Sequence, residues 1–105
     1  MSGFRIHHLV DREFAEVRAW YGEHSPRAAE HFVSRFLVAL ARIKSRPTAH
    51  ALWVAPFRRV RLVRFPYIVL FHEDRSIVSV LALVHERREP RRICASTRQR
   101  LRELK

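Results

Sequence analysis

The stretch Arg58–Pro90, RRVRLVRFPYIVLFHEDRSIVSVLALVHERREP, decides the fold of this chain of 105 residues. It holds three runs in which apolar residues alternate with polar ones or follow one another, as they do in β-strands, and no glycine interrupts it. Arginines, a tyrosine and a histidine stand near the ends of these runs. The stretch therefore predicts a β-meander with a cationic surface that suits phosphate or carboxylate.

The first run of the meander is predicted to be an amphipathic strand. Successive side chains of a strand point to opposite faces, so Val60 and Leu62 belong to the same face. The spacing also divides the arginines of this run: Arg58 and Arg64 share the face of Val60, and Arg59 and Arg61 lie on the other face.

The two other runs are predicted to pair as a hairpin at the centre of the sheet. Tyr67–His72 and Ile77–Val84 are almost continuously apolar, and the second is rich in β-branched residues. Such runs are typical of buried strands. Glu73–Ser76 is polar and is predicted to form the turn between them.

Upstream of the meander the apolar residues recur with the period of an α-helix. A first helix is predicted from an N-cap at Asp11 to Gly22 or His24. Ser25-Pro26 predicts the start of a second helix, because serine caps free N–H groups and proline tolerates the first helical position. This helix should end near Arg46, since a proline follows it. The short connection predicts an antiparallel helical hairpin.

Weaker signals describe the remaining segments. Residues 4–9 are predicted to form a short strand, in which His7 and His8 would point to opposite faces. Residues 47–56 are predicted to be a loop. Residues 95–104 are predicted to form a short basic helix, which needs to dock on the sheet or on a partner because of its length.

The order of these elements defines the expected fold class. The order β-α-α-β-β-β, with a possible short C-terminal helix, predicts an α+β fold in which an antiparallel sheet packs against the α-helical hairpin. The length suits a single domain over residues 1–105. An apolar fraction of 48% is enough for a folded core despite the high charge.

The charge of the chain points to an anionic partner. There are 21 Lys and Arg residues against 10 Asp and Glu residues, which gives a net charge of +11. The excess requires solvent or a partner such as nucleic acid, an anionic lipid surface or an acidic protein. Clustering of the arginines favours a partner over a merely solvated surface.

Several kinds of site are not expected from the composition. Gly3 and Gly22 are the only glycines, so no glycine-rich phosphate loop and no nucleotide cofactor is predicted. Cys94 is the only cysteine, which excludes an intramolecular disulfide and a cysteine-based zinc site. The seven scattered histidines predict no metal site. No apolar run approaches the roughly 20 residues that span a bilayer, so a cytoplasmic protein without a membrane partner is expected.

Two sets of residues are candidates for function. If the chain cleaves RNA, the expected catalytic set is Arg59, Arg61, Tyr67, His85 and Arg87. In this set the tyrosine and the histidine would transfer protons, and the arginines would stabilise charge on the phosphate. The alternative is that Tyr67 packs on the sheet and that His85 is a strand-end residue held by a backbone carbonyl. The predicted partner-binding arginines are Arg58, Arg59, Arg61, Arg64, Arg87, Arg88, Arg91 and Arg92.

Four short motifs follow one another in an order that resembles a known superfamily. They are Trp20-Tyr21, Ser25-Pro26, Arg64–Tyr67 (RFPY) and Val84–Pro90 (VHERREP). The order and spacing of these motifs, together with the length of the chain, resemble those of the RelE/ParE superfamily of type II toxins, also called plasmid stabilisation proteins. The resemblance implies a compact toxin that a cognate acidic antitoxin neutralises, while another part of the antitoxin binds operator DNA.

The resemblance also bears on mechanism. RelE-like members cut mRNA on the ribosome with a central arginine on the second strand of the meander and a tyrosine near the C-terminus. Here Tyr67 stands where that arginine is expected, and no tyrosine follows His85. ParE-like members lack this set and poison DNA gyrase. We therefore expect a ParE-like, non-enzymatic growth inhibitor, with a ribosome-dependent mRNA endoribonuclease as the alternative and a basic nucleic-acid-binding module as the third hypothesis.

Overall fold

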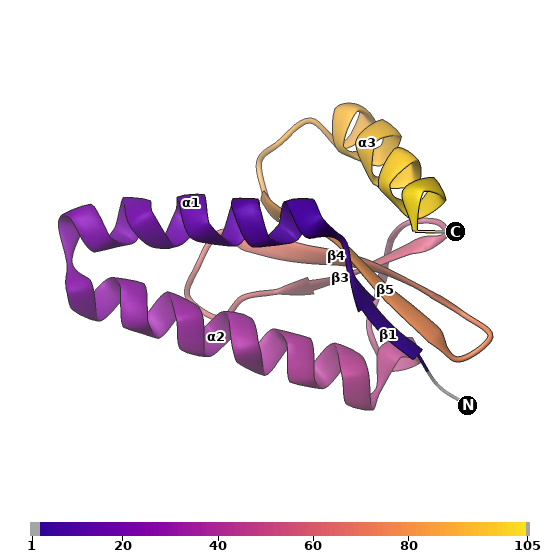
Figure 1. The fold of residues 1–105 in the computed structure, drawn as a ribbon, viewed down its shortest axis with the longest axis horizontal. Helices are drawn as coiled ribbons and strands as arrows, with labels where there is room; N and C mark the ends of the chain where they lie inside the picture. The colour runs from indigo at the N-terminus through magenta and orange to yellow at the C-terminus, as the bar shows by residue number, and fades with distance from the viewer. Residues whose placement is uncertain (1–2, 105) are drawn as a thin grey trace.

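The structure, a computed structural model, describes residues 3–104 and has an α+β fold (Figure 1). The strands form one sheet in the order β1-β5-β4-β3-β2. The elements in chain order are β1 (Gly3–Ile6), α1 (His8–His24), α2 (Pro26–Ser45), the short 3-10 helix η1 (Pro47–Ala49), β2 (Leu52–Val54), β3 (Phe57–Arg61), β4 (Tyr67–Asp74), β5 (Ile77–His85) and α3 (Pro90–Glu103).

The predicted meander is confirmed, but the sheet is not antiparallel throughout. Strands β3, β4 and β5 pair antiparallel in sequence, and β2 pairs antiparallel with β3. Strand β1 instead pairs parallel with β5, so that Phe4 lies opposite Val78. No tight turn joins these two strands, so the chain between them leaves their relative direction free.

The first helix begins earlier than expected, and this corrects the N-terminal prediction. The N-cap is His7 and not Asp11, because the Nδ1 atom of His7 accepts a hydrogen bond of 3.1 Å from the N–H of Leu9. Asp11 lies in the first turn, where its carboxylate complements the helix dipole. The chain turns into the helix between His7 and His8, so their rings stack at 4.3 Å and do not point to opposite faces.

The second helix agrees with the sequence prediction. The Oγ atom of Ser25 accepts a hydrogen bond from the N–H of Ala28 at 3.2 Å, and Pro26 occupies the first helical turn. Helix α2 ends at Ser45, directly before the residue that precedes a proline. Its apolar stripe packs on one face of the sheet, which we call the hairpin face. The buried core of that face contains Phe32, Phe36, Ile43, Val60, Val69, Phe71 and Leu83.

Helix α3 covers the opposite face of the sheet, which we call the α3 face. The helix begins at Pro90 and not at Ala95, because proline suits the first turn and Ile93 of that turn is buried. Its neighbours in this second core are Ile68, Leu70, Ala82 and Val84, with Trp53 packed against them. Figure 1 shows α3 apart from the helical hairpin, near the start of α1.

Strand β2 was not expected from the sequence. The segment was predicted to be part of a loop, but Leu52–Val54 pairs with the beginning of β3. The strand is only three residues long and Pro56 follows closely. So short a run carries no readable alternation, and its pairing depends on β3 being present.

Candidate functional site

Arg59 and Arg61 lie on the α3 face of the sheet. They stand opposite Leu70 and Ile68 in the pairing of β3 with β4, and both of those residues belong to the α3-face core. Val60, between the two arginines, is buried in the hairpin-face core. The predicted division is therefore confirmed for Arg58–Arg61, and Arg59 and Arg61 are exposed. It is wrong for Arg64, because β3 ends at Arg61 and Arg64 lies in the following turn and not on a strand face.

Tyr67 and His85 lie together, on the other side of the sheet from these arginines. They are direct partners in the pairing of β4 with β5, and their ring centroids are 5.2 Å apart in an edge arrangement. Tyr67 packs against the hairpin-face core, with its ring 6.1 Å from that of Phe32. Burial, and then the nearby Tyr67, raise the pKa of Tyr21, which also packs here. This aromatic cluster belongs to the hairpin face.

The environment of His85 differs from the backbone-carbonyl contact considered above. Its Nδ1 atom accepts a hydrogen bond of 3.1 Å from the N–H of Arg87. The ring proton of the neutral imidazole therefore resides on Nε2. The contact also brings Arg87 next to His85 through its backbone. Three of the five residues of the RNA-cleaving set, Tyr67, His85 and Arg87, are thus neighbours.

Arg61, by contrast, is paired within the chain. Its Nε atom donates to Oε2 of Glu86 at 2.7 Å. This hydrogen bond lowers the pKa of Glu86 and raises that of Arg61. Both side chains are solvent-exposed, so the pair contributes little to stability. A ligand anion at this position would have to compete with Glu86 for the guanidinium.

The other predicted partner-binding arginines are spread over the molecule. Arg58 points to the hairpin side, where its Nη1 atom donates to the carbonyl of His50 at 2.6 Å. Arg64 is exposed in the β3–β4 turn and has a positive φ of 70°. The exposed arginines after β5 lie in the turn and the first helical turn of α3: Arg87, Arg88, Arg91 and Arg92. The eight arginines therefore do not form one patch.

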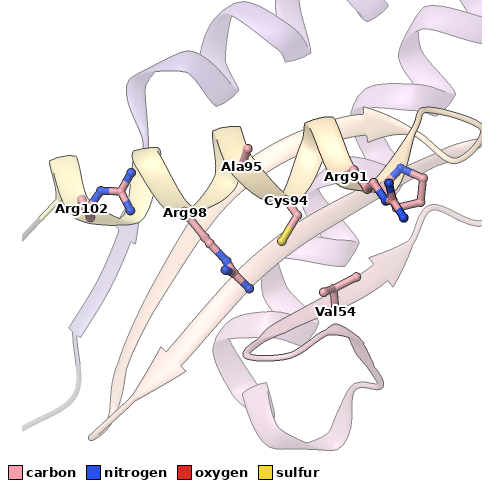
Figure 2. A pocket seen from close by; sticks show the side chains of 7 residues that line it. Val54, Arg91, Cys94, Ala95, Arg98 and Arg102 are labelled. Carbon is pink, nitrogen blue, oxygen red and sulfur yellow. The ribbon is translucent and has the colours of Figure 1, made fainter.

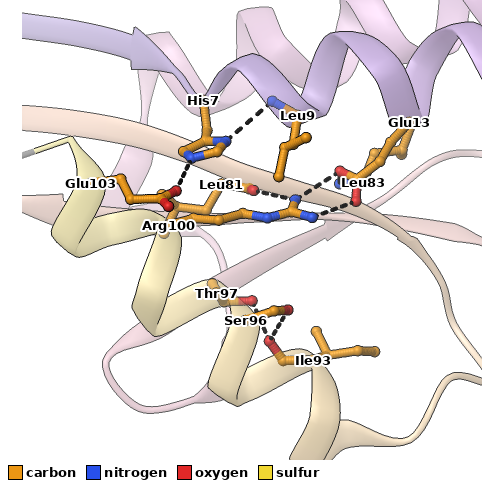
Figure 3. Close-up of polar contacts among 10 residues, drawn as sticks. All are labelled: His7, Leu9, Glu13, Leu81, Leu83, Ile93, Ser96, Thr97, Arg100 and Glu103. Carbon is orange, nitrogen blue, oxygen red and sulfur yellow. Dashed lines mark hydrogen bonds and ion pairs between the residues drawn. The ribbon is translucent and has the colours of Figure 1, made fainter.

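The residues that hold α3 in place were not found from the sequence (Figure 3). The Nη1 and Nη2 atoms of Arg100 donate to the two carboxylate oxygens of Glu13, each at 3.0 Å, and Nη1 also donates to the carbonyl of Leu81. Oε1 of Glu13 also accepts the N–H of Leu83. These contacts give hydrogen-bond partners to the backbone groups of Leu81 and Leu83, which lie on the edge of β5 beyond the end of β1. Glu13 and Arg100 are 87 positions apart, so no local pattern could predict the pair.

Two more contacts fix the end of α3. The Nε2 atom of the fully buried His7 donates to Oε1 of Glu103 at 2.6 Å, because Nδ1 already accepts from the backbone. This hydrogen bond lowers the pKa of Glu103. Arg5 donates to the carbonyl of Leu104 and to Oγ of Ser79. The C-terminal helix is therefore docked without a partner.

A groove of about 500 Å³ runs between α3 and β2 (Figure 2). Its helical side carries Arg91, Arg98 and Arg102, with Cys94 and Ala95 between them, and Val54 lies on the opposite side. A second groove of about 610 Å³ lies between α1 and α2 and is lined mainly by small residues such as Ala19 and Gly22. Both are open surface features that suit a polypeptide segment.

Within residues 3–104, no group of three or more His, Cys, Asp or Glu side chains gathers as it would around a metal ion. None of the helices in this range is both long and apolar enough to cross a bilayer.

The fold is shared with a solved structure. A chain in the structure described as the chromosomal ParDE TA system from P. aeruginosa superposes with a TM-score of 0.70 and 15% sequence identity. The match covers 81% of this chain and 96% of that chain. No protein-family model matches the sequence, and no curated protein matches it significantly. The likeness establishes a common fold at low sequence identity.

Proposed function

We propose that this chain is the toxin of a type II toxin–antitoxin system, from the ParE-like branch of the RelE/ParE superfamily, acting in the cytoplasm. The observation that carries the proposal is the fold shared with a chain of the ParDE system. The order of the sequence motifs supports it independently. A net charge of +11 suits a cognate acidic antitoxin, with operator DNA bound only through that antitoxin.

The arrangement of the candidate catalytic residues supports a protein-binding toxin. Cleavage of RNA needs proton-transferring groups and charge-stabilising groups around one phosphate. Tyr67 lies on the hairpin face, whereas Arg59 and Arg61 lie on the α3 face. Arg61 also pairs with Glu86. We therefore favour a non-enzymatic inhibitor of an essential machine such as DNA gyrase.

Expression of the chain from a repressible promoter in bacteria tests the toxin proposal. Induction alone should arrest growth, and co-expression of the acidic protein encoded beside the gene should restore it and give a complex that co-purifies. A target assay then follows: the purified chain should inhibit supercoiling by gyrase. Normal growth together with no complex would overturn the toxin proposal, and unaffected supercoiling would overturn gyrase as the target.

An mRNA endoribonuclease is the second candidate, because Tyr67, His85 and Arg87 are neighbours. Primer extension on transcripts after induction would reveal new 5′ ends if this function is correct. His85→Ala and Arg87→Ala should then abolish the cuts, while Arg12→Ala, on the exposed side of α1, should not. Growth arrest without new 5′ ends would exclude the nuclease.

A further inference from the structure

The groove between α3 and β2 is a site with a charged side and an apolar side. Pro90, Ala95 and Val54 supply apolar surface, and Figure 2 shows the Cys94 sulfur and the Arg98 guanidinium directed into the space between helix and strand. Beneath this face the sheet is already packed by Trp53 and Ile93. The groove is thus formed on a rigid support.

The three arginines that line this groove lie along one side of α3. Positions 91, 98 and 102 are separated by seven and four residues, which brings them to the same side of a helix. At 1.5 Å per residue the stripe is about 17 Å long. Among residues 3–104, none of the three guanidinium groups takes part in an ion pair, and Arg102 donates only to the side chain of Gln99. Their charge is available to a ligand.

The contacts at the C-terminal end keep this stripe in position. Arg100 points away from the groove and pairs with Glu13, while Glu103 receives the hydrogen bond from His7. Four of the five arginines of α3 are therefore divided between two roles: Arg100 docks the helix, and Arg91, Arg98 and Arg102 line the groove. A helix that was not docked could not present a fixed spacing of positive charges.

We infer that this groove binds an acidic peptide segment that carries aliphatic side chains between its carboxylates, and that this segment belongs to the antitoxin, an inference that rests on the proposed function. Carboxylates would pair with the guanidinium stripe, and aliphatic side chains would cover Ala95 and Val54. Single-stranded nucleic acid fits less well, because binding of bases needs aromatic stacking platforms and the lining residues include no aromatic side chain.

Cys94 provides a direct reporter, because it is the only cysteine of the chain and lines the groove. The probe is a fluorescein-labelled peptide of alternating glutamate and leucine blocks, about 12 residues long, which spans about 18 Å as a helix. Saturation with this peptide should slow the alkylation of Cys94 by iodoacetamide, and a peptide with lysine in place of glutamate should not. An unchanged alkylation rate at saturation would overturn the inference.

Charge reversal tests the stripe itself. Arg98→Glu with Arg102→Glu should raise the Kd of the acidic peptide about tenfold or more. The matched control is Arg12→Glu with Arg35→Glu, which changes the net charge equally at two exposed positions of the hairpin. The control should change the Kd less than about threefold at physiological salt, since distant charges are screened. An equal loss of affinity in both variants would show that the peptide is held by non-specific charge attraction and would overturn the inference.

A third variant tests the shape of the groove at constant charge. Ala95 is exposed, so Ala95→Trp should fold normally while filling the space beside Cys94. Loss of peptide binding with an unchanged circular dichroism spectrum is the expected result. Binding of a single-stranded oligouridylate that is lost in the Arg98→Glu, Arg102→Glu variant, without binding of the peptide, would overturn the inference in favour of a nucleic-acid site.

The complex with the antitoxin separates this inference from the proposed function. Cys94 should be protected from alkylation in that complex. If the antitoxin neutralises the toxin but leaves Cys94 reactive, as it would when seated only in the groove of the helical hairpin, the inference fails and the proposed function stands. If the chain binds the acidic peptide at Cys94 but arrests no growth, the proposed function fails and the groove is supported.

Discussion

The hairpin face of the sheet is packed by the aromatic and aliphatic side chains of two long helices, whereas the α3 face is covered by one helix that buries only Ile93 and Thr97. On the hairpin face the arginine Arg58 is tied to a backbone carbonyl. On the α3 face Arg59 and the groove arginines remain exposed. The difference indicates that the first face supplies most of the stability and that the second is available for recognition.

Removal of the Phe32 ring, at the centre of the hairpin-face core, should have the largest effect on the free energy of unfolding. Phe32 is 0% exposed, and its ring centroid lies 5.5 Å from that of Phe14 and 5.6 Å from that of Phe65. Phe32→Ala should lower the free energy of unfolding by about 4 kcal/mol, because it removes a buried ring and leaves a cavity. Urea denaturation measures this. A loss below about 1.5 kcal/mol would contradict the dominance of this face, since buried rings normally cost more.

The corresponding change on the α3 face should cost less. Ile93→Ala should lower the free energy of unfolding by about 2.5 kcal/mol, near the lower end for a buried aliphatic residue. Limited proteolysis should also cut near the start of α3 sooner in this variant, because Ile93 is its main apolar anchor. A loss equal to that of Phe32→Ala would show that the two faces contribute alike.

Loss of the polar attachment of α3 should have the third-largest effect on the free energy of unfolding. In the Glu13–Arg100 pair the side chains are 16% and 15% exposed. Glu13→Ala should cost about 2 kcal/mol, because the guanidinium of Arg100 loses its carboxylate partner and keeps only the carbonyl of Leu81, while the N–H of Leu83 loses its acceptor. Hydrogen exchange at Leu83 should accelerate as well. Slow exchange at this amide in the variant would exclude Glu13 as its acceptor.

The smallest effect should come from Glu103, and it should depend on pH. Its pKa is lowered in the folded protein by the hydrogen bond from His7. A lowered folded pKa stabilises the protein above the unfolded value of about 4.3, and this contribution is lost as the pH falls through the folded value. Wild type should therefore have a higher Tm than Glu103→Gln at neutral pH. The difference should shrink below about pH 4, as measured by thermal unfolding across pH, and a constant difference would argue against an ionised Glu103.

Local sequence signals were sufficient to predict many of the helices and strands. Ser25 and Pro26 correctly predicted the start of α2, and the two apolar runs correctly predicted β4 and β5. Each of these signals acts within one element, through capping or through the period of the side chains. The predicted start of α1 was wrong. Asp11 belongs to a residue type that commonly caps helices, whereas the cap formed by His7 depends on the position of its ring, which places Nδ1 within hydrogen-bond distance of the N–H of Leu9.

Pairings between distant segments could not be read in the same way. The parallel direction of β1 depends on how the hairpin returns the chain to the sheet. In the candidate site, the alternation correctly separated Arg59 from Arg58, but it could not show that Tyr67 lies on the opposite face from Arg61. That relation requires the register between strands, which the hydrophobic pattern of each strand leaves open.

The closure of the β5 edge by Glu13 and Arg100 has a consequence for biosynthesis. Strand β5 is translated before Arg100, so a nascent chain that has completed the sheet still exposes the carbonyl of Leu81 and lacks the partner of Glu13. An open strand edge is a template for pairing with another chain. The fold is therefore completed only after the last turns of α3 have been synthesised, and a chain released before residue 100 would be prone to aggregate.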